Sequence, residues 1–274
     1  MANLDLDTPT PLLIASLAAA AFLAGFVDAI GGGGGLVSLP ALLAAGLSPG
    51  VALATNKGQA IFGAISSFVS YGRRGGIDRA RAPIGFIAGF IGSCGGALAL
   101  MAMRPEPLRP VVIGLLILAA VIVLLVRPAQ RPPMIGAQSR RTETGTETET
   151  ATGWRGGAAL GAIGLGLGAY DGFFGPGAGS MLIIAFAVVF GDSLTRASGN
   201  AKVVNLASNL AAFLLFARRG TILWHLALPM AGANALGAAV GARVALRHGD
   251  RLVRAVVLAV VTAVVIKLSL DLAR

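Results

Sequence analysis

The chain consists largely of apolar stretches, each near the length that an α-helix needs to cross a lipid bilayer. Of its 274 residues, 55% are hydrophobic and only 12% are charged. A spanning helix requires about 20 predominantly apolar residues. Stretches of roughly this length occupy residues 12–30, 51–71, 83–103, 109–126, 156–174, 197–217, 224–246 and 252–270. We therefore predict an all-α, polytopic membrane protein.

Two further apolar segments, residues 33–46 and 179–190, are too short to cross a bilayer comfortably. Each follows a glycine-rich break, at Gly31–Gly35 and at Gly175–Gly179. Each short segment is expected to form a half-helix or a re-entrant arm. Because unwound backbone is tolerated at membrane depth only where it lines a protected or hydrated cavity, the two breaks indicate a transport site.

The two halves of the chain resemble each other at one constant offset. Lys57 corresponds to Lys202, and Arg73–Gly75 corresponds to Arg218–Gly220. Internal repeats with weak identity are the usual construction of secondary transporters. We therefore expect a first membrane repeat and a second one, each with about four full transmembrane helices and one short or re-entrant helix.

The expected boundaries follow from composition. The first repeat spans residues 1–126 and the second spans residues 154–274. Residues 127–153 are rich in Pro, Arg, Thr and Glu, which predicts a solvated, disordered linker.

The orientation of the repeats depends on whether the short segments cross the bilayer. If they cross, the repeats are inverted and the arginines of the loops divide fourteen to four between the two sides. If they do not cross, the division is eleven to seven. Since Lys and Arg accumulate on the cytoplasmic side, the larger bias favours inverted repeats with both termini outside.

Lys57 and Lys202 are the sharpest candidates for binding a solute. An ammonium group within an apolar helix is costly unless it meets an anion or water. Asn205 and Asn209 lie on the same helical stripe as Lys202. The second half is therefore expected to be richer in polar ligands than the first.

Asp28 and Asp171 each precede a glycine break. A carboxylate at this position is a candidate carrier of a coupling proton if burial favours its protonated form. Two alternatives stay open. In the first, each aspartate fixes a turn at the membrane interface. In the second, it pairs with Lys57 or Lys202 as a tie between helices, and a lysine without such a partner extends its ammonium group to the interface.

The start of each short helix offers unpaired N–H groups and the positive end of a helix dipole, which together bind anions. Close helix packing is the alternative use of the same glycines. The complete set of candidate solute ligands is Lys57, Lys202, Asn56, Asn200, Asn205, Asn209, Gln59, Gly33, Gly34, Gly177, Gly179 and Ser180.

Several classes of function are disfavoured by composition. The net charge of +10 comes mainly from arginines at the ends of apolar segments, which indicates membrane anchoring rather than nucleic-acid binding. Cys94 is the only cysteine, and the two histidines lack partners at ligand spacing. We therefore expect no metal, no cofactor, no nucleic-acid partner and no enzymatic activity.

The chain resembles the TauE/SafE family of sulfite and organosulfonate exporters over nearly its whole length outside the linker. The resemblance lies in Gly25–Pro40, Ala52–Lys57 and Tyr71–Asp78, with second copies at Gly175–Ser180 and Arg218–Ile222. It implies a multi-pass protein of the inner membrane that exports a small sulfur-containing anion, either sulfite or a sulfonate.

The leading hypothesis is a secondary transporter of such an anion, driven by an ion gradient, with Asp28 or Asp171 as the candidate carrier of a coupling proton. The expected partners are the small anionic solute and the lipid bilayer, and the formation of a homo-oligomer is left open. The alternatives are a transporter of another small organic anion and a non-transporting membrane scaffold or partner subunit.

Overall fold

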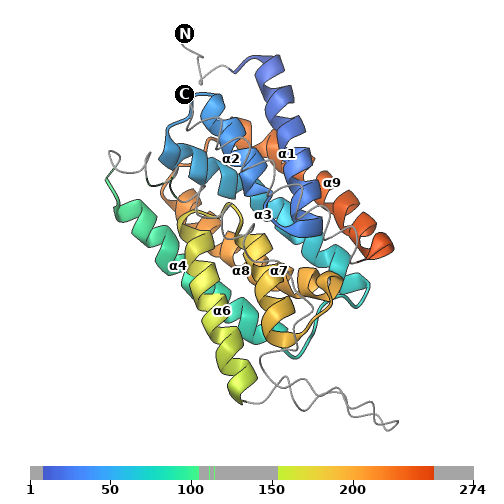
Figure 1. Cartoon of the computed structure of the whole chain (residues 1–274). Coiled ribbons are helices and arrows are strands. Elements are labelled where there is room, and N and C mark those ends of the chain that lie inside the picture. Colours follow the sequence, from blue (N-terminus) through green and yellow to red (C-terminus); the bar gives the residue numbers. More distant parts are fainter. Residues whose placement is uncertain (1–8, 105–110, 112–113, 115–153, 250–274) are drawn as a thin grey trace.

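A computed structural model describes residues 9–104, 111, 114 and 154–249, which form eight helices and no strand (Figure 1). The helices are α1 (Pro11–Gly31), α2 (Gly35–Ala44), α3 (Pro49–Arg73), α4 (Ala82–Ala102), α6 (Trp154–Phe173), α7 (Ala178–Phe190), α8 (Leu194–Arg218) and α9 (Trp224–His248). The prediction of an all-α fold is therefore confirmed for this part of the chain. The linker at 127–153 and the apolar stretch at 252–270 lie outside the described residues, as does 109–126 apart from residues 111 and 114.

The helix lengths follow the apolar stretches of the sequence. Within the described residues, six helices have 20 to 25 residues. Three of them, α1, α4 and α8, are both long and apolar enough to cross a membrane by length and composition. The helices α2 and α7, with 10 and 13 residues, are the short segments that follow the glycine breaks. This distribution is typical of a polytopic membrane protein.

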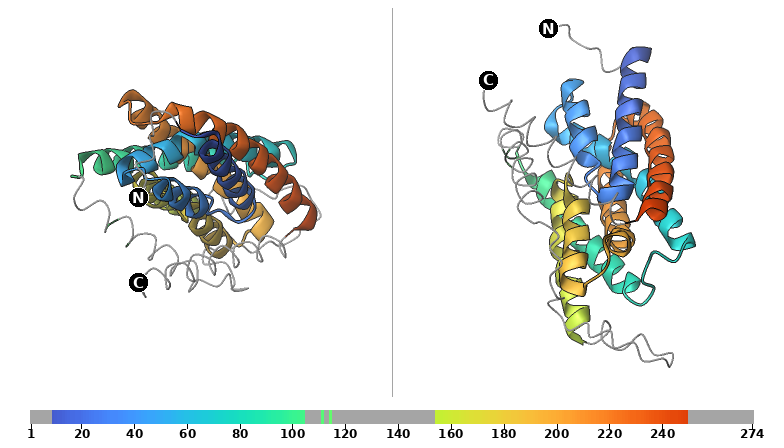
Figure 2. Two further views of the ribbon diagram at one scale, coloured as in Figure 1. Left: turned by 90° about the horizontal axis from the view of Figure 1, so that it is seen from above. Right: turned by 45° about the vertical axis from the view of Figure 1, so that its right-hand side comes forward.

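Helices of each half pack mainly against helices of the other half. α1 packs along α9, and α4 packs along α6 (Figures 1 and 2). α3 of the first half packs against α9 of the second half, and α8 of the second half packs against α4 of the first half in the same way. α3 and α8 also pack against each other. In Figure 1, α1 descends to the centre of the bundle whereas α6 ascends to it. The packed core therefore lies largely between the halves rather than within either one.

Glycines allow helices of the two halves to approach at backbone distance. Gly92 and Gly96 of α4 lie against α6, and their counterparts Gly237 and Gly241 of α9 lie against α1. A Cβ atom on Gly96 would be only 1.9 Å from the carbonyl oxygen of Ala169. Small residues at helix crossings of this kind are the usual basis of close packing in membranes.

Alanine at Gly96 is expected to lower the free energy of unfolding by about 1–3 kcal/mol, because the backbone of α6 must move to admit the methyl group. The adjacent Gly95 has no atom within 4 Å of its Cβ position, so Gly95→Ala is the matched control. It should leave stability unchanged or raise it slightly, since alanine favours a helix over glycine. Thermal unfolding in one detergent checks this prediction, and equal midpoints for the two variants would contradict the packing described here.

The two glycine breaks meet at the centre of the fold. Gly32 and Gly175 have φ angles of 69° and 96°, which glycine adopts without steric cost. A Cβ atom on Gly32 would lie 2.2 Å from the carbonyl carbon of Gly179. The hydroxyl of Ser180 donates a hydrogen bond of 2.8 Å to the carbonyl of Gly31. The first break therefore packs directly on the start of α7.

Candidate functional site

A polar cavity of about 40 Å³ lies where the glycine breaks meet α3, α8 and α9. Its wall contains one ammonium group, two carboxylates and five side-chain amides. The charged residues are Lys57, Asp28 and Asp171, and the amides are Asn56, Gln59, Asn205, Asn209 and Asn234. Since a buried water needs roughly 10–15 Å³ of such space, the cavity has room for a few waters or for a solute of a few heavy atoms.

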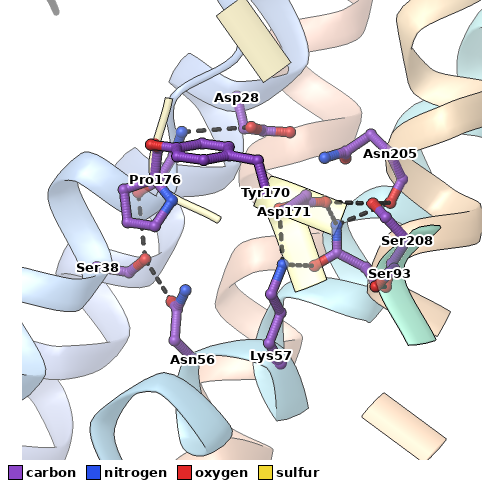
Figure 3. A network of polar contacts seen from close by, with 12 residues as sticks. Asp28, Ser38, Asn56, Lys57, Ser93, Tyr170, Asp171, Pro176, Asn205 and Ser208 are labelled. Atoms are coloured by element: carbon purple, nitrogen blue, oxygen red, sulfur yellow. Dashed lines mark hydrogen bonds and ion pairs between the residues drawn. The ribbon is translucent and has the colours of Figure 1, made fainter. Parts of the chain in front are cut away.

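Lys57 of α3 and Asp171 of α6 form an ion pair in the wall of this cavity (Figure 3). Nζ of Lys57 is 2.7 Å from Oδ1 of Asp171, and the two side chains are only 4% and 3% exposed. Nζ also lies 3.5 Å from Oδ1 of Asn209. The other carboxylate oxygen of Asp171 accepts a hydrogen bond from the hydroxyl of Ser208 and one of 3.4 Å from Nδ2 of Asn209.

Lys202 of α8 and Asp28 of α1 form a second ion pair, with Nζ 2.8 Å from Oδ2. The ammonium group of Lys202 also donates to the main-chain carbonyl of Asp28. The other carboxylate oxygen of Asp28 accepts the N–H of Gly34 at 3.3 Å, at the start of α2. Each pair joins a lysine of one half to an aspartate of the other half, so the ties considered from the sequence are formed between the halves.

The structure brings most of the predicted ligands together. Besides the charged residues, the cavity wall contains Asn56, Gln59, Gly33, Gly34, Gly179, Asn205 and Asn209 from the predicted set. Lys202 does not line the cavity, and its ammonium group is paired with Asp28, which does. Gly177, with φ of 83°, is the N-cap of α7, and Ser180 lies on the backbone of the first break.

Two residues that contribute here had little or no signal in the sequence. Ser208 lies beside Asp171, and its position in an apolar helix next to Asn209 was the only hint. Asn234 reaches the cavity from α9, where Gly63 leaves room for it. A Cβ atom on Gly63 would lie 1.7 Å from Oδ1 of Asn234.

The amides of the cavity retain unused hydrogen-bonding capacity. The Ser38 hydroxyl and Nε2 of Gln59 both donate to Oδ1 of Asn56, at 2.6 and 2.9 Å. Within the described part of the chain, Oε1 of Gln59 is buried without a partner, and the side chain of Asn205 makes no hydrogen bond. Because unpartnered buried polar groups are costly, these amides favour water or a polar solute in the cavity.

Asn200 lies outside the cavity, in a charged cluster between the α3–α4 and α7–α8 loops. The guanidinium of Arg81 lies 2.8 Å from Asp78 and 2.9 Å from Asp192. Asn200 donates to Asp192 at 2.7 Å and accepts the N–H of Asp78 at 2.8 Å. The predicted solute ligand Asn200 is thus used in a loop-to-loop contact.

Burial acts to raise the pKa of Asp78, but the hydrogen bonds and charge of Arg81 outweigh it, so this pKa lies below its ordinary value. The carboxylate therefore contributes stability above its unfolded-state pKa. This contribution is lost as the pH falls through the depressed folded-state pKa.

The residues at the positions in the repeat that correspond to this charged cluster are largely apolar. At the constant offset, Leu223, Leu226, Leu47 and Thr55 stand in the positions of Asp78, Arg81, Asp192 and Asn200. Oγ1 of Thr55 accepts the N–H of Leu223 at 3.2 Å, just as Asn200 accepts the N–H of Asp78. Leu47 and Leu226 are buried in one apolar cluster. The two sets of residues thus share one hydrogen bond from a backbone N–H to a side chain. The rest of the contact is made by charged side chains around Arg81 and by apolar side chains around Leu226.

Methionine in place of Arg81 is expected to lower the free energy of unfolding by about 3–5 kcal/mol, because it leaves the carboxylate of Asp192 buried without its cation. That side chain is only 6% exposed. Arg196 approaches the same two aspartates at 3.6 and 4.0 Å but is 60% exposed. Arg196→Met is therefore the control, with an expected loss below about 1 kcal/mol. Thermal unfolding of both variants tests the prediction, and similar losses would show that burial is not the deciding factor.

Comparison with known proteins adds independent information. Residues 17–268 match the family model described as "Sulfite exporter TauE/SafE". "Probable membrane transporter protein YfcA" of Escherichia coli strain K12 is 36% identical over 244 residues, which cover 89% of this chain and 84% of that protein. A "Probable membrane transporter protein" of Haemophilus influenzae is 35% identical over 235 residues, which cover 84% of each chain. No solved structure matches.

Proposed function

The chain belongs to the TauE/SafE family and is a membrane transporter, and from this premise we propose that it carries a small sulfur-containing anion. Sulfite and organosulfonates are the solute class. The proposed binding site is the cavity at Lys57. The single observation that carries the proposal is the buried ammonium group of Lys57 in the wall of a cavity that five side-chain amides also line.

The donors around the cavity support an anionic solute. Lys57 supplies a positive charge, and the side-chain amides supply N–H donors. The short helices α2 and α7 both begin at the cavity, with Gly35 and Gly179 in its wall. Helix starts favour anions because their first N–H groups lack intrahelical partners and the helix dipole is positive there.

The size of the cavity supports a small solute. A volume of about 40 Å³ suits an anion with a single central sulfur better than a long organic acid. Organosulfonates with larger substituents would require the cavity to open toward α2 or α7.

We further propose that transport is secondary, coupled to protons through Asp28 or Asp171, and directed outward across the inner membrane. The repeats are proposed to be inverted, with boundaries at residues 1–126 and 154–274 and a disordered linker at 127–153. The opposite courses of α1 and α6 and the packing of each half against the other support the inversion. In such folds the solute site lies between the repeats, near the broken helices.

Uptake of labelled sulfite into proteoliposomes under an imposed pH gradient tests the proposal. We expect saturable, protein-dependent flux that excess unlabelled sulfite or methanesulfonate suppresses and that a pH gradient accelerates. Protein-free liposomes are the control. A ligand that binds only the folded state must also raise thermal stability. Absence of both flux and stabilisation with sulfite, sulfonates and thiosulfate would reject the proposal and favour a membrane scaffold.

A further inference from the structure

The two lysine–aspartate pairs differ in their surroundings, although the lysines correspond at the constant offset and each aspartate precedes a glycine break. Lys57 and Asp171 both line the cavity, whereas only Asp28 of the other pair does so. Resting on the proposed function, we infer that the transported anion and Asp171 compete for Lys57. Asp171 takes up one proton for each monovalent anion bound, while the pair of Lys202 with Asp28 stays intact.

The pair of Lys202 with Asp28 differs in that its ammonium group does not border the cavity. Lys202 is 1% exposed and donates to both the carboxylate and the main-chain carbonyl of Asp28. The remaining carboxylate oxygen of Asp28 accepts the N–H of Gly34. An anion that displaced the carboxylate of Asp28 would have to reach an ammonium group that does not border the cavity, whereas Lys57 lies in the cavity wall. This pair therefore acts as a fixed tie between the halves.

The pair of Lys57 with Asp171 is open to exchange. Asp171 is the only carboxylate in contact with Lys57 within the described residues. The backbone of the second glycine break lies directly beside the pair. A Cβ atom on Gly175 would be 2.9 Å from Nζ of Lys57 and 3.1 Å from Oδ1 of Asp171. Glycine at this position leaves the ammonium group and the carboxylate uncovered by a side chain on this side.

Charge balance requires the proton. The buried pair carries one positive and one negative charge, so it is neutral as a unit. A monovalent anion bound to Lys57 would leave an excess negative charge at side chains that are only 4% and 3% exposed, which is strongly unfavourable. A proton from water, taken up by the displaced carboxylate of Asp171, restores neutrality. The hydroxyl oxygen of Ser208, already hydrogen-bonded to Oδ2 of Asp171, can accept the new O–H while its own proton turns to the main-chain carbonyl of Asn205 at 3.0 Å.

Among the described residues, no charged group other than Lys57 is paired with Asp171. The titratable residues in the central turns around Asp171 are Lys57 on α3, Lys202 on α8, Cys94 on α4, Asp28 across the cavity on α1 and Tyr170 on its own helix, with none on α7. Lys202 is held by Asp28, and the hydroxyl of Tyr170 donates to the carbonyl of Pro176 at 2.8 Å.

Proton uptake on anion binding tests the inference directly. Methanesulfonate is the probe, because it stays ionised near neutral pH and does not itself exchange protons. The purified full-length protein is titrated by calorimetry in two buffers with different ionisation enthalpies, which yields the number of protons bound per anion. We expect about one proton per anion in the wild type, and a tenfold loss of affinity for each unit of rising pH while the proton must be taken from solution.

Asp171→Asn is expected to bind the anion without proton uptake and with an affinity independent of pH, whereas Asp28→Asn should keep the uptake of one proton. If the wild type bound the anion without taking up a proton, the inference would be overturned and the proposed anion transport would stand. This outcome needs only the wild type, so it can be read even if neither variant folds. Loss of uptake in Asp28→Asn alone would overturn the assignment to Asp171. Failure of the wild type to bind methanesulfonate and sulfite at all would instead reject the proposed function, and the inference with it.

Discussion

Replacement of Lys57 by methionine is expected to reduce saturable anion uptake by about a hundredfold or more. The variant removes the only ammonium group that borders the cavity among the described residues. Truncation of one partner of a buried, hydrogen-bonded charge pair costs roughly 2–5 kcal/mol, and a tenfold change in binding corresponds to about 1.4 kcal/mol. Labelled sulfite uptake at several concentrations measures the effect, with Arg196→Met as an exposed-cation control.

Lys57→Met also leaves Asp171 buried without its partner, which lowers stability for a reason unrelated to transport. The double variant Lys57→Met/Asp171→Asn separates the two effects, because it contains no uncompensated buried charge at this site. We expect it to unfold at a higher temperature than the single variant and to remain inactive. Anion uptake by the folded double variant would contradict the assignment of Lys57 as the solute ligand.

Methionine in place of Lys202 is expected to have its largest effect on stability, with a loss of about 3–5 kcal/mol in the free energy of unfolding. The substitution removes both contacts with Asp28, which tie α8 to the end of α1. Thermal and denaturant unfolding in detergent measure the loss. The same substitution at Lys57 serves as the internal comparison, since both lysines are nearly fully buried.

A double-mutant cycle with Asp28→Asn tests the origin of this loss. Lys202→Met/Asp28→Asn should recover part of the stability, because the unpaired carboxylate is then absent. The coupling between the two positions reports the strength of the tie. If Lys202→Met abolished uptake at unchanged stability, Lys202 would be a solute ligand, as the asparagines on its stripe suggested, and not a tie.

Local features of the chain were readable from the sequence because they depend on short segments alone. Segment length and apolar character determine where spanning helices lie, and the predicted positions agree with the six long helices of the described residues. The breaks at Gly32 and Gly175 were recognisable because only glycine adopts their backbone angles without strain. The buried lysines were conspicuous because an ammonium group is so costly in an apolar helix.

The partners of the two lysines were decided only by the tertiary structure. The partners of Lys57 and Lys202 lie 114 and 174 residues away along the chain, so the pairing depends on how the halves pack. Asn205 and Asn209 share a stripe with Lys202, which favoured that lysine as the solute ligand. In the fold, the two asparagines border the cavity while Lys202, one turn earlier, meets Asp28. Helical periodicity specifies which residues share a face, but the crossing of neighbouring helices determines what each turn of that face contacts.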